Sequence, residues 1–176
     1  GDKIVLGFDG GKTHDATALV AIRIEDTYVE LLELWEKPDG AAGKHWQVNR
    51  AQVNSAVLDA FRLYDVVAFY GDVAQWESYL DAWAVQFGEQ LAVRATQKHP
   101  LAWDMRGLQK ASTEAHETLL TACQDKLLKH AGTSTPEGVD LRRHVLNAIR
   151  RENTWGVYFD KESRESPRRI DAYAAL

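Results

Sequence analysis

The sequence predicts an α/β fold in which a central mixed sheet of five or more strands, three antiparallel and then parallel, is flanked by helices. Two observations carry this prediction. Strand-like and helix-like patterns follow one another in the order β-β-β-α-β-α-β-α, which is typical of a meander continued by strands that helices connect. A chain of 176 residues with 45% hydrophobic content is also long enough to bury a core, so we expect one domain over residues 1–176.

Three β-rich stretches open the chain. The apolar run KIVLGFD (3–9) is followed by the turn-rich GGKTHD and by a second run, ATALVAIRI (16–24), and a short connection of this kind indicates a hairpin. A third run, YVELLELWEK (28–37), follows the turn EDT and alternates loosely between apolar and polar residues. We therefore expect a three-stranded antiparallel meander.

A helix, a buried strand and a second helix are expected next. Apolar residues recur at helical spacing over 41–64, which predicts an amphipathic helix on the sheet. The unbroken apolar run DVVAFYGD (65–72) is typical of a strand covered on both faces. A helix over 73–88 follows, with Gly88 as its C′ residue, and it carries Trp76 and Trp83 toward the core.

The second half of the chain mixes short elements with longer helices. It is expected to form, in order, a strand over 91–96, a helix over 108–130, a helix over 140–151, a strand or extended loop over 155–163, and a helix that begins near Ser166 and Pro167. The last helix reaches the end of the chain without a C-cap signal. We therefore expect the domain to come from a longer protein.

Charge and composition exclude several classes of protein. The net charge of −5 argues against a protein that coats nucleic acid by charge alone. Between Asp140 and Arg169, however, eight Lys and Arg stand against five Asp and Glu, so this stretch predicts either a phosphate-facing surface or a solvated charged face. Neither a membrane helix nor a signal peptide is indicated, and a reducing, cytoplasmic setting follows.

Three acids stand where a sheet of this order would bring them together. Asp9 ends the first strand, Asp72 ends the fourth, and Asp171 lies near the start of the last helix. The first and fourth strands are expected side by side, so Asp9 and Asp72 converge and Asp171 completes the cluster. Three carboxylates repel one another, and their natural partners are two hard divalent ions, Mg²⁺ or Mn²⁺. Two such ions can activate water and stabilise a leaving oxygen at a phosphodiester.

Other polar residues are candidates for auxiliary roles. Asp15 is either a further acid of the site or a turn residue, and Asp104 is a loop acid that could reach it. Lys161 lies on the strand before the last acid, where a cation could hold the scissile phosphate or offset carboxylate repulsion. His14, in the same loop as Asp15, is either a phosphate or metal contact or an exposed side chain.

A basic stretch near the C-terminus is the candidate DNA-binding surface. His144, Asn147 and Arg151 share one helical face, which suits phosphate contacts or capping of neighbouring loops. The full set of candidates is Arg142, Arg143, His144, Asn147, Arg150, Arg151, Arg168 and Arg169.

Three strings of residues resemble the nuclease domain of phage terminase large subunits, which has a ribonuclease H-like fold. They are LGFDGGKTHDATALVA (6–21), FYGDVAQW (69–76) and RHVLNAIRRENTWGVYFDKESRESPRRIDAYAAL (143–176). The last is the most specific, because a basic RHVLNA helix, a Lys-bearing strand and a terminal IDAYAAL rarely occur in that order by chance. Together the strings span nearly the whole chain.

The resemblance implies an endonuclease that cuts concatemeric double-stranded viral DNA during packaging, with little sequence preference and with two metal ions. Asp9 would bridge both ions, while Asp72 and Asp171 would bind one each. The resemblance also implies a packaging ATPase domain upstream in the same chain. A portal protein and a small terminase subunit would be partners, and the cytoplasm of an infected bacterium would be the location.

Three other interpretations remain open. A resolvase or transposase core would use the same acids on the same scaffold. A fragment of an actin-like sugar kinase or ATPase also opens with an acid-tipped strand, although the later glycine-rich nucleotide loop is missing from the sequence. The third interpretation is a non-catalytic module that grips DNA or docks on a portal. A phosphate-binding loop is excluded, because GGKT has Leu6 where that motif needs glycine and a strand follows.

Overall fold

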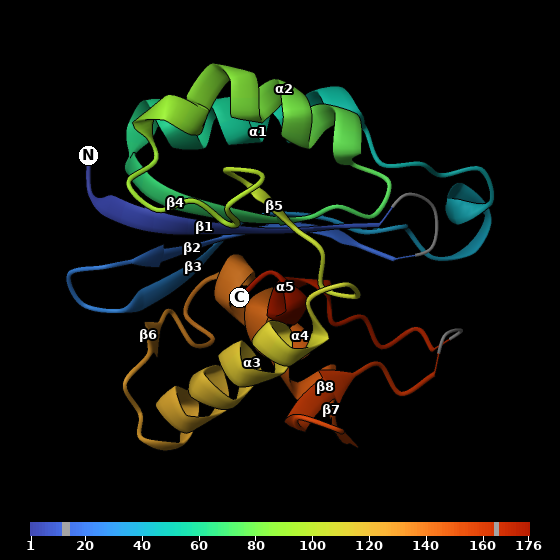
Figure 1. Cartoon of the computed structure of the whole chain (residues 1–176). Coiled ribbons are helices and arrows are strands. Elements are labelled where there is room, and N and C mark those ends of the chain that lie inside the picture. Colours follow the sequence, from blue (N-terminus) through green and yellow to red (C-terminus); the bar gives the residue numbers. More distant parts are fainter. Residues whose placement is uncertain (12–14, 164–165) are drawn as a thin grey trace.

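Six strands form one mixed sheet with helices on both faces (Figure 1). The computed structural model describes residues 1–11, 15–163 and 166–176. The strand order is β5-β4-β1-β2-β3-β6. Helices α1 (Arg50–Leu63) and α2 (Glu77–Phe87) cover one face, and α3 (Gln109–Gln124), α4 (Pro136–Asn147) and α5 (Asp171–Ala174) lie on the other. The predicted α/β class and the mixed sheet flanked by helices are confirmed.

The predicted meander is present at the N-terminus. β1 (Lys3–Gly10) pairs antiparallel with β2 (Thr17–Arg23), which pairs antiparallel with β3 (Tyr28–Trp35). β4 (Asp65–Asp72) then returns to lie parallel to β1, on its other side. β1 is therefore hydrogen-bonded on both edges, at the centre of the sheet, and the predicted adjacency of the first and fourth strands is confirmed.

The two helices after the meander are shorter than predicted. α1 begins at Arg50 and not at 41, because the side chain of Asn49 accepts hydrogen bonds from two backbone N–H groups of the first turn, and the short 3-10 helix η1 (Gly40–Gly43) precedes it. α2 begins at Glu77. Gly88 is not a left-handed C′ residue, since its φ is −58° and the chain continues into the 3-10 helix η2 (Gly88–Gln90).

The strand predicted over 91–96 is wrong. Val93 donates one backbone hydrogen bond to Val67 of β4, but the chain then turns back on itself through a bond from Thr96 to His99. The partner of β4 at this edge is instead the two-residue strand β5 (Ala102–Trp103), which lies parallel to it. The strand comes later than predicted because the turn at 96–99 intervenes.

The C-terminal elements also differ in their limits. The helix predicted over 108–130 ends at Gln124, since Lys126 takes a φ of +57°, and β6 (Lys129–His130) follows, parallel to β3. The helix predicted over 140–151 begins earlier, because the Thr135 side chain caps it, and it ends at Asn147. The last helix begins at Asp171 and not near Ser166.

A two-stranded ribbon stands apart from the main sheet. β7 (Ile149–Asn153) pairs antiparallel with β8 (Gly156–Asp160), and the ribbon packs on α3. Residues 149–151 were predicted to be helical and are a strand instead. The turn between the strands explains the difference: Asn153 Oδ1 accepts the N–H groups of Trp155 and Gly156, and Gly156 has a φ of +141°.

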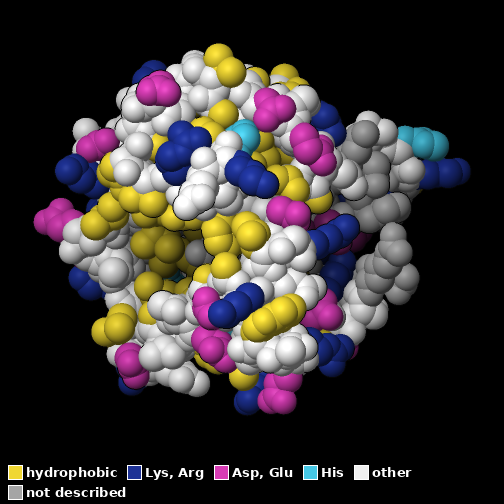
Figure 2. All heavy atoms as spheres, viewed as in Figure 1, with side chains coloured by type: hydrophobic (Ala, Val, Ile, Leu, Met, Phe, Trp, Pro, Cys, Tyr) yellow, Lys and Arg dark blue, Asp and Glu magenta, His cyan; other side chains and the backbone are white. Residues whose placement is uncertain are grey.

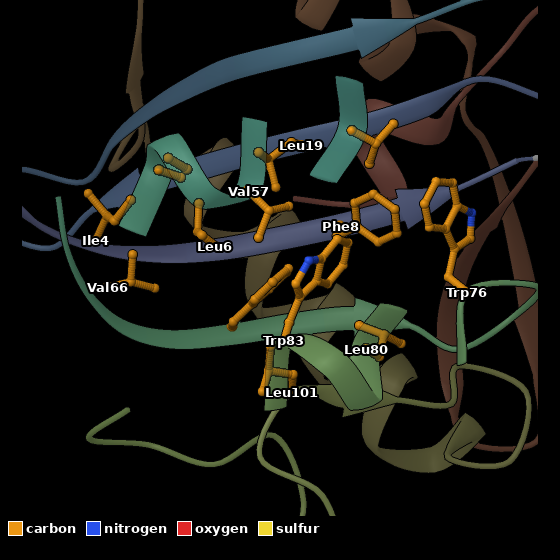
Figure 3. Packing of buried hydrophobic residues seen from close by; sticks show 14 of the residues in the cluster. Ile4, Leu6, Phe8, Leu19, Val57, Val66, Trp76, Leu80, Trp83 and Leu101 are labelled. Atoms are coloured by element: carbon orange, nitrogen blue, oxygen red, sulfur yellow. The ribbon is translucent and has the colours of Figure 1, made fainter. Parts of the chain in front are cut away.

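The larger core lies between the sheet and helices α1 and α2 (Figure 3). Phe8 of β1 lies edge-on to Trp76 and Trp83, with ring centroids 5.1 and 5.6 Å apart. Both tryptophans are buried, as predicted. A smaller apolar cluster on the opposite face joins β2 and β3 to α4 and α5. Of the helices in the described part of the chain, none has both the length and the apolar character needed for a membrane span.

Candidate functional site

Asp9 and Asp72 leave the sheet side by side. Phe8 of β1 is in register with Gly71 of β4, so the residues that follow each of them are neighbours at the carboxyl ends of two parallel strands. Phe8 points into the core with α1 and α2, and a side chain at Gly71 would meet Leu80 of α2. Because successive residues of a strand point to opposite faces, Asp9 and Asp72 both point toward α5.

Asp171 reaches the same place from α5, on the face of the sheet toward which Asp9 and Asp72 point. It is the first residue of α5, which packs against β1 and β2. Gly7 permits this packing, because a Cβ atom on Gly7 would overlap the carbonyl oxygen of Ala175 at the end of α5. Only glycine allows the helix to approach β1 so closely at this point. The sequence thus places two strand-borne acids and one helix-borne acid at one edge of the sheet.

These acids line one open pocket of about 1120 Å³. Its walls come from the ends of β1 and β4, the segment around η1, and the residues before α5. The charged residues that line it are Asp9, Asp15, Asp39, Asp72 and Asp171 on the acidic side and Lys37, Lys44, Arg106, Lys161 and Arg169 on the basic side. A polar pocket with both kinds of charge suits a ligand that combines cations with phosphate.

The carboxyl groups of the pocket are costly to ionise together. Burial, followed by the charges of Asp171, Asp72 and Asp15, raises the pKa of Asp9 well above its ordinary range. Burial and the charge of Asp15 raise the pKa of Asp171 to about 6, and burial raises that of Asp72. A bound cation would relieve this repulsion, so the donor set fits a hard divalent ion, which prefers oxygen ligands.

The described acids do not by themselves supply a complete set of protein ligands for one metal ion. Among residues 1–11, 15–163 and 166–176, no three His, Cys, Asp or Glu side chains form a group that could hold one metal ion by themselves. Mg²⁺ commonly takes only one or two carboxylates and completes its shell with water and substrate phosphate. Pairs of acids that share Asp9 are compatible with that chemistry.

Of the predicted auxiliary residues, the structure brings two into the pocket and leaves one out. Lys161 Nζ donates a hydrogen bond of 2.7 Å to Asp15 Oδ1, and both residues line the pocket. Asp104 does not line it; its Oδ1 accepts the backbone N–H of Arg106 and so closes a turn. His14 lies outside the described residues.

Four members of the predicted DNA-binding set are held by contacts within the protein. His144 is fully buried, so the prediction that it contacts DNA is wrong. The alternative prediction, that it caps a neighbouring segment, is confirmed, because the Ala172 N–H donates to its Nδ1. Arg143 forms a bidentate pair with Glu36. Asn147 donates to the backbone oxygen of Arg169, and the side chain of Arg169, which lines the pocket, donates to the backbone oxygen of Lys37.

The other four candidates remain on the surface. Arg142 is exposed. Arg150 pairs with Glu152, Arg151 with Asp160, and Arg168 with Glu162, all at the protein surface. Their contact with DNA stays a prediction.

Sequence reasoning missed several residues at the pocket. Lys37, Lys44 and Arg106 lie in loops, where no periodic pattern indicates which way a side chain points. Tyr158 of β8 is near the acids: burial, followed by the charges of Asp9 and Asp72, raises its pKa to about 12, so it stays a hydroxyl donor. Its place in the ribbon was not predictable, because the sequence pattern of residues 155–163 fits either a strand or an extended loop.

A second cavity, of about 410 Å³, lies between the sheet and α3. Its lining is mostly apolar, and Figure 2 shows hydrophobic side chains around a hollow on this face. Asp72 stands on its wall, so this acid separates the apolar cavity from the charged pocket. Its mostly apolar lining does not suit a hydrated ion, so among the described residues the charged pocket is the better candidate for binding ions.

Comparison with known proteins gives two kinds of likeness. No family model matches the chain. The gene 13 proteins of Mycobacterium phages D29 and L5 are 39% and 38% identical over 173 residues, which cover 98% of this chain. The chain spans 28% of the length of these relatives.

The second likeness is to solved structures. The large terminase nuclease from the thermophilic phage G20c has a TM-score of 0.54 at 12% identity, over 99% of this chain and 78% of that one. The structure of that nuclease with bound magnesium gives a TM-score of 0.52, again at 12% identity and with the same coverage. The likeness confirms the predicted ribonuclease H-like fold.

Proposed function

We propose that this chain is the nuclease domain of a phage terminase large subunit, a metal-dependent endonuclease that cuts concatemeric double-stranded DNA during genome packaging with little sequence preference. The observation that carries the proposal is the convergence of Asp9, Asp72 and Asp171 at one pocket, where burial raises the pKa of each. The fold shared with a large terminase nuclease and the likeness to phage proteins support it.

Two Mg²⁺ or Mn²⁺ ions would be held with Asp9 shared between them and with Asp72 and Asp171 on one ion each. The pKa of Asp9 responds to the charges of both other acids, which suits the shared position. When bound, such ions supply activated water and stabilise the leaving oxygen of a phosphodiester. The magnesium-bound structure of the G20c nuclease supports the choice of a divalent ion.

The remaining pocket residues bind and orient DNA. Lys161 is 16% exposed and holds its ammonium group at Asp15, from which it can turn to a phosphate oxygen. Arg106 and Lys44 are exposed at the pocket, and neither forms an ion pair with a described carboxylate. These cations would hold the phosphates on either side of the scissile bond.

The wider assignments are part of the same proposal. Residues 1–176 would form a single nuclease domain, and a packaging ATPase would lie upstream in the same protein. A portal protein and a small terminase subunit would be partners, and the enzyme would act in the cytoplasm of the infected bacterium. The share of the phage relatives that this chain spans leaves room for such a domain.

Cleavage of supercoiled plasmid tests the proposal. The wild-type chain should cut with Mn²⁺ or Mg²⁺ and not with EDTA, and the Asp9→Ala, Asp72→Ala and Asp171→Ala variants should fall to the metal-free background. Asp59→Ala is the control, because it removes an exposed acid of α1 that lies outside the pocket. Folded wild type that never cuts, or that hydrolyses ATP, would refute the proposal. Preferential cutting of four-way junctions would favour a resolvase.

A further inference from the structure

Two buried histidines hold the short helix that carries Asp171. α5 has only four residues, and a helix of one turn is not stable by itself. Its position therefore depends on its neighbours. His144 of α4 and His116 of α3 are both buried, and they contact Ala172 and Tyr173, the two residues that directly follow Asp171.

The hydrogen bonds of His144 define which ring nitrogen carries hydrogen. The backbone N–H of Ala172 donates to Nδ1 at 3.0 Å, and an amide N–H can only donate. Nδ1 is therefore an acceptor without hydrogen, and Nε2 donates to Glu36 Oε1, which lies at 3.0 Å. The imidazole thus links the backbone of α5 to a carboxylate that follows β3.

Glu36 is itself held firmly. Arg143 donates to both of its carboxylate oxygens, at 3.1 and 2.7 Å, and Arg169 NH1 lies 3.5 Å from Oε1. Burial alone would raise the pKa of Glu36, but the hydrogen bonds from His144 and Arg143 outweigh burial and lower it to about 2. An ionised Glu36 keeps the hydrogen on Nε2 and leaves Nδ1 free to accept.

His116 makes the corresponding contact one residue further along. Its Nδ1 lies 2.9 Å from the carbonyl oxygen of Val157, which can only accept, so Nδ1 donates. Nε2 is then the acceptor for the hydroxyl of Tyr173, at 3.0 Å. The ribbon strand β8, α3 and α5 are joined through this one ring.

We propose that His144 and His116 are positioning residues that act through Ala172 and Tyr173 to fix the carboxylate of Asp171 where it binds metal. The inference rests on the proposed function. Neither ring lines the charged pocket, so neither is expected to touch metal or DNA. Groups that orient a metal ligand in this way typically change metal affinity by about 10- to 100-fold when they are removed.

A matched pair of substitutions separates positioning from core packing. The side-chain oxygen of Asn can occupy the place of Nδ1, so His144→Asn can still accept the Ala172 N–H, although it loses Glu36. His144→Gln reaches the place of Nε2 and can donate to Glu36, but it leaves the Ala172 N–H without its acceptor. Both variants remove the ring, so a role in packing alone predicts the same effect for both.

The measurement is the affinity of the 176-residue chain for Mn²⁺ by titration calorimetry, together with thermal unfolding in EDTA. We expect His144→Gln to weaken Mn²⁺ binding about 10- to 100-fold and His144→Asn to change it less than about threefold. Val57→Ala, in the core on the opposite face of the sheet, should lower the melting temperature without changing Mn²⁺ affinity.

Tyr173→Phe tests the second contact, because it deletes the hydroxyl that donates to His116. This variant also keeps the inference testable if the His144 variants do not fold. It should weaken Mn²⁺ binding in the same direction. Tyr79→Phe, on α2 and outside the charged pocket, serves as the control for loss of a hydroxyl. Equal Mn²⁺ affinity in wild type, His144→Gln and Tyr173→Phe would overturn the inference and leave the nuclease proposal standing. Folded wild type that does not bind Mn²⁺ would overturn the nuclease proposal itself.

Discussion

Replacing Asp171 with Asn should stabilise the metal-free protein, and the gain should depend on pH. The folded pKa of Asp171 is about 6, against about 3.9 for an unfolded Asp. The folded state therefore holds this proton more tightly, and the free energy of unfolding of the wild type falls as pH rises from about 4 through 6. Above pH 7 the full decrease in the free energy of unfolding is on the order of 3 kcal/mol. The Asp171→Asn variant has no ionisable group at this position and should not show this decrease.

The assay is thermal unfolding in EDTA at several pH values between 4 and 8. For a chain of this length 1 kcal/mol corresponds to about 2–4 °C, so the variant should melt about 6–12 °C above wild type at pH 8, with the smallest gap near pH 4. Added Mg²⁺ should raise the melting temperature of wild type alone. The exposed Glu89→Gln is the control. A gap that stays constant with pH would refute the argument, because it would mean that the Asp171 charge is not costly.

Three further predictions follow from the packing and the charges. Gly7→Ala should destabilise the fold by about 1–3 kcal/mol and weaken Mn²⁺ binding, because the added methyl group overlaps Ala175; an unchanged melting temperature and Mn²⁺ affinity would contradict the close approach. Combined Lys44→Ala and Arg106→Ala should weaken DNA binding and reduce the slope of log K against log salt by about 1.8, as measured by fluorescence anisotropy in EDTA. An unchanged slope would place the DNA elsewhere. Trp83→Phe should lower the free energy of unfolding, measured with urea, by about 1–3 kcal/mol, because the hydrogen bond from Nε1 to Asn54 is lost. An unchanged free energy of unfolding would show that this hydrogen bond does not contribute to stability.

The strand-borne part of the site was predictable from the sequence. An apolar run that ends in an acid gives both the strand and the place of its last side chain, so Asp9 and Asp72 were found together with the adjacency of β1 and β4. Asp171 was placed in the cluster from the order of elements, as an acid near the start of the last helix, and the resemblance then implied the same role. Its helix proved to be four residues long, which is too short for any periodic signal.

Loop residues and short strands could not be predicted in the same way. Arg106 reaches the pocket because Asp104 closes a turn that directs the chain, and this turn has no signature beyond its two polar residues. β5 is recognised only by its pairing with β4. His144 was assigned to a surface because its helix is basic, yet its partner Glu36 lies far away in sequence and makes burial of a polar ring favourable.

The three acids of the pocket also differ in when they leave the ribosome. β1 and β4 can pair once the first half of the chain has been made, whereas Asp171 comes after every strand of the sheet. At typical rates of synthesis the delay between Asp72 and Asp171 is about 5 to 20 seconds. Throughout that interval a nascent chain holds Asp9 and Asp72 without Asp171, which is added when this region is almost completely translated.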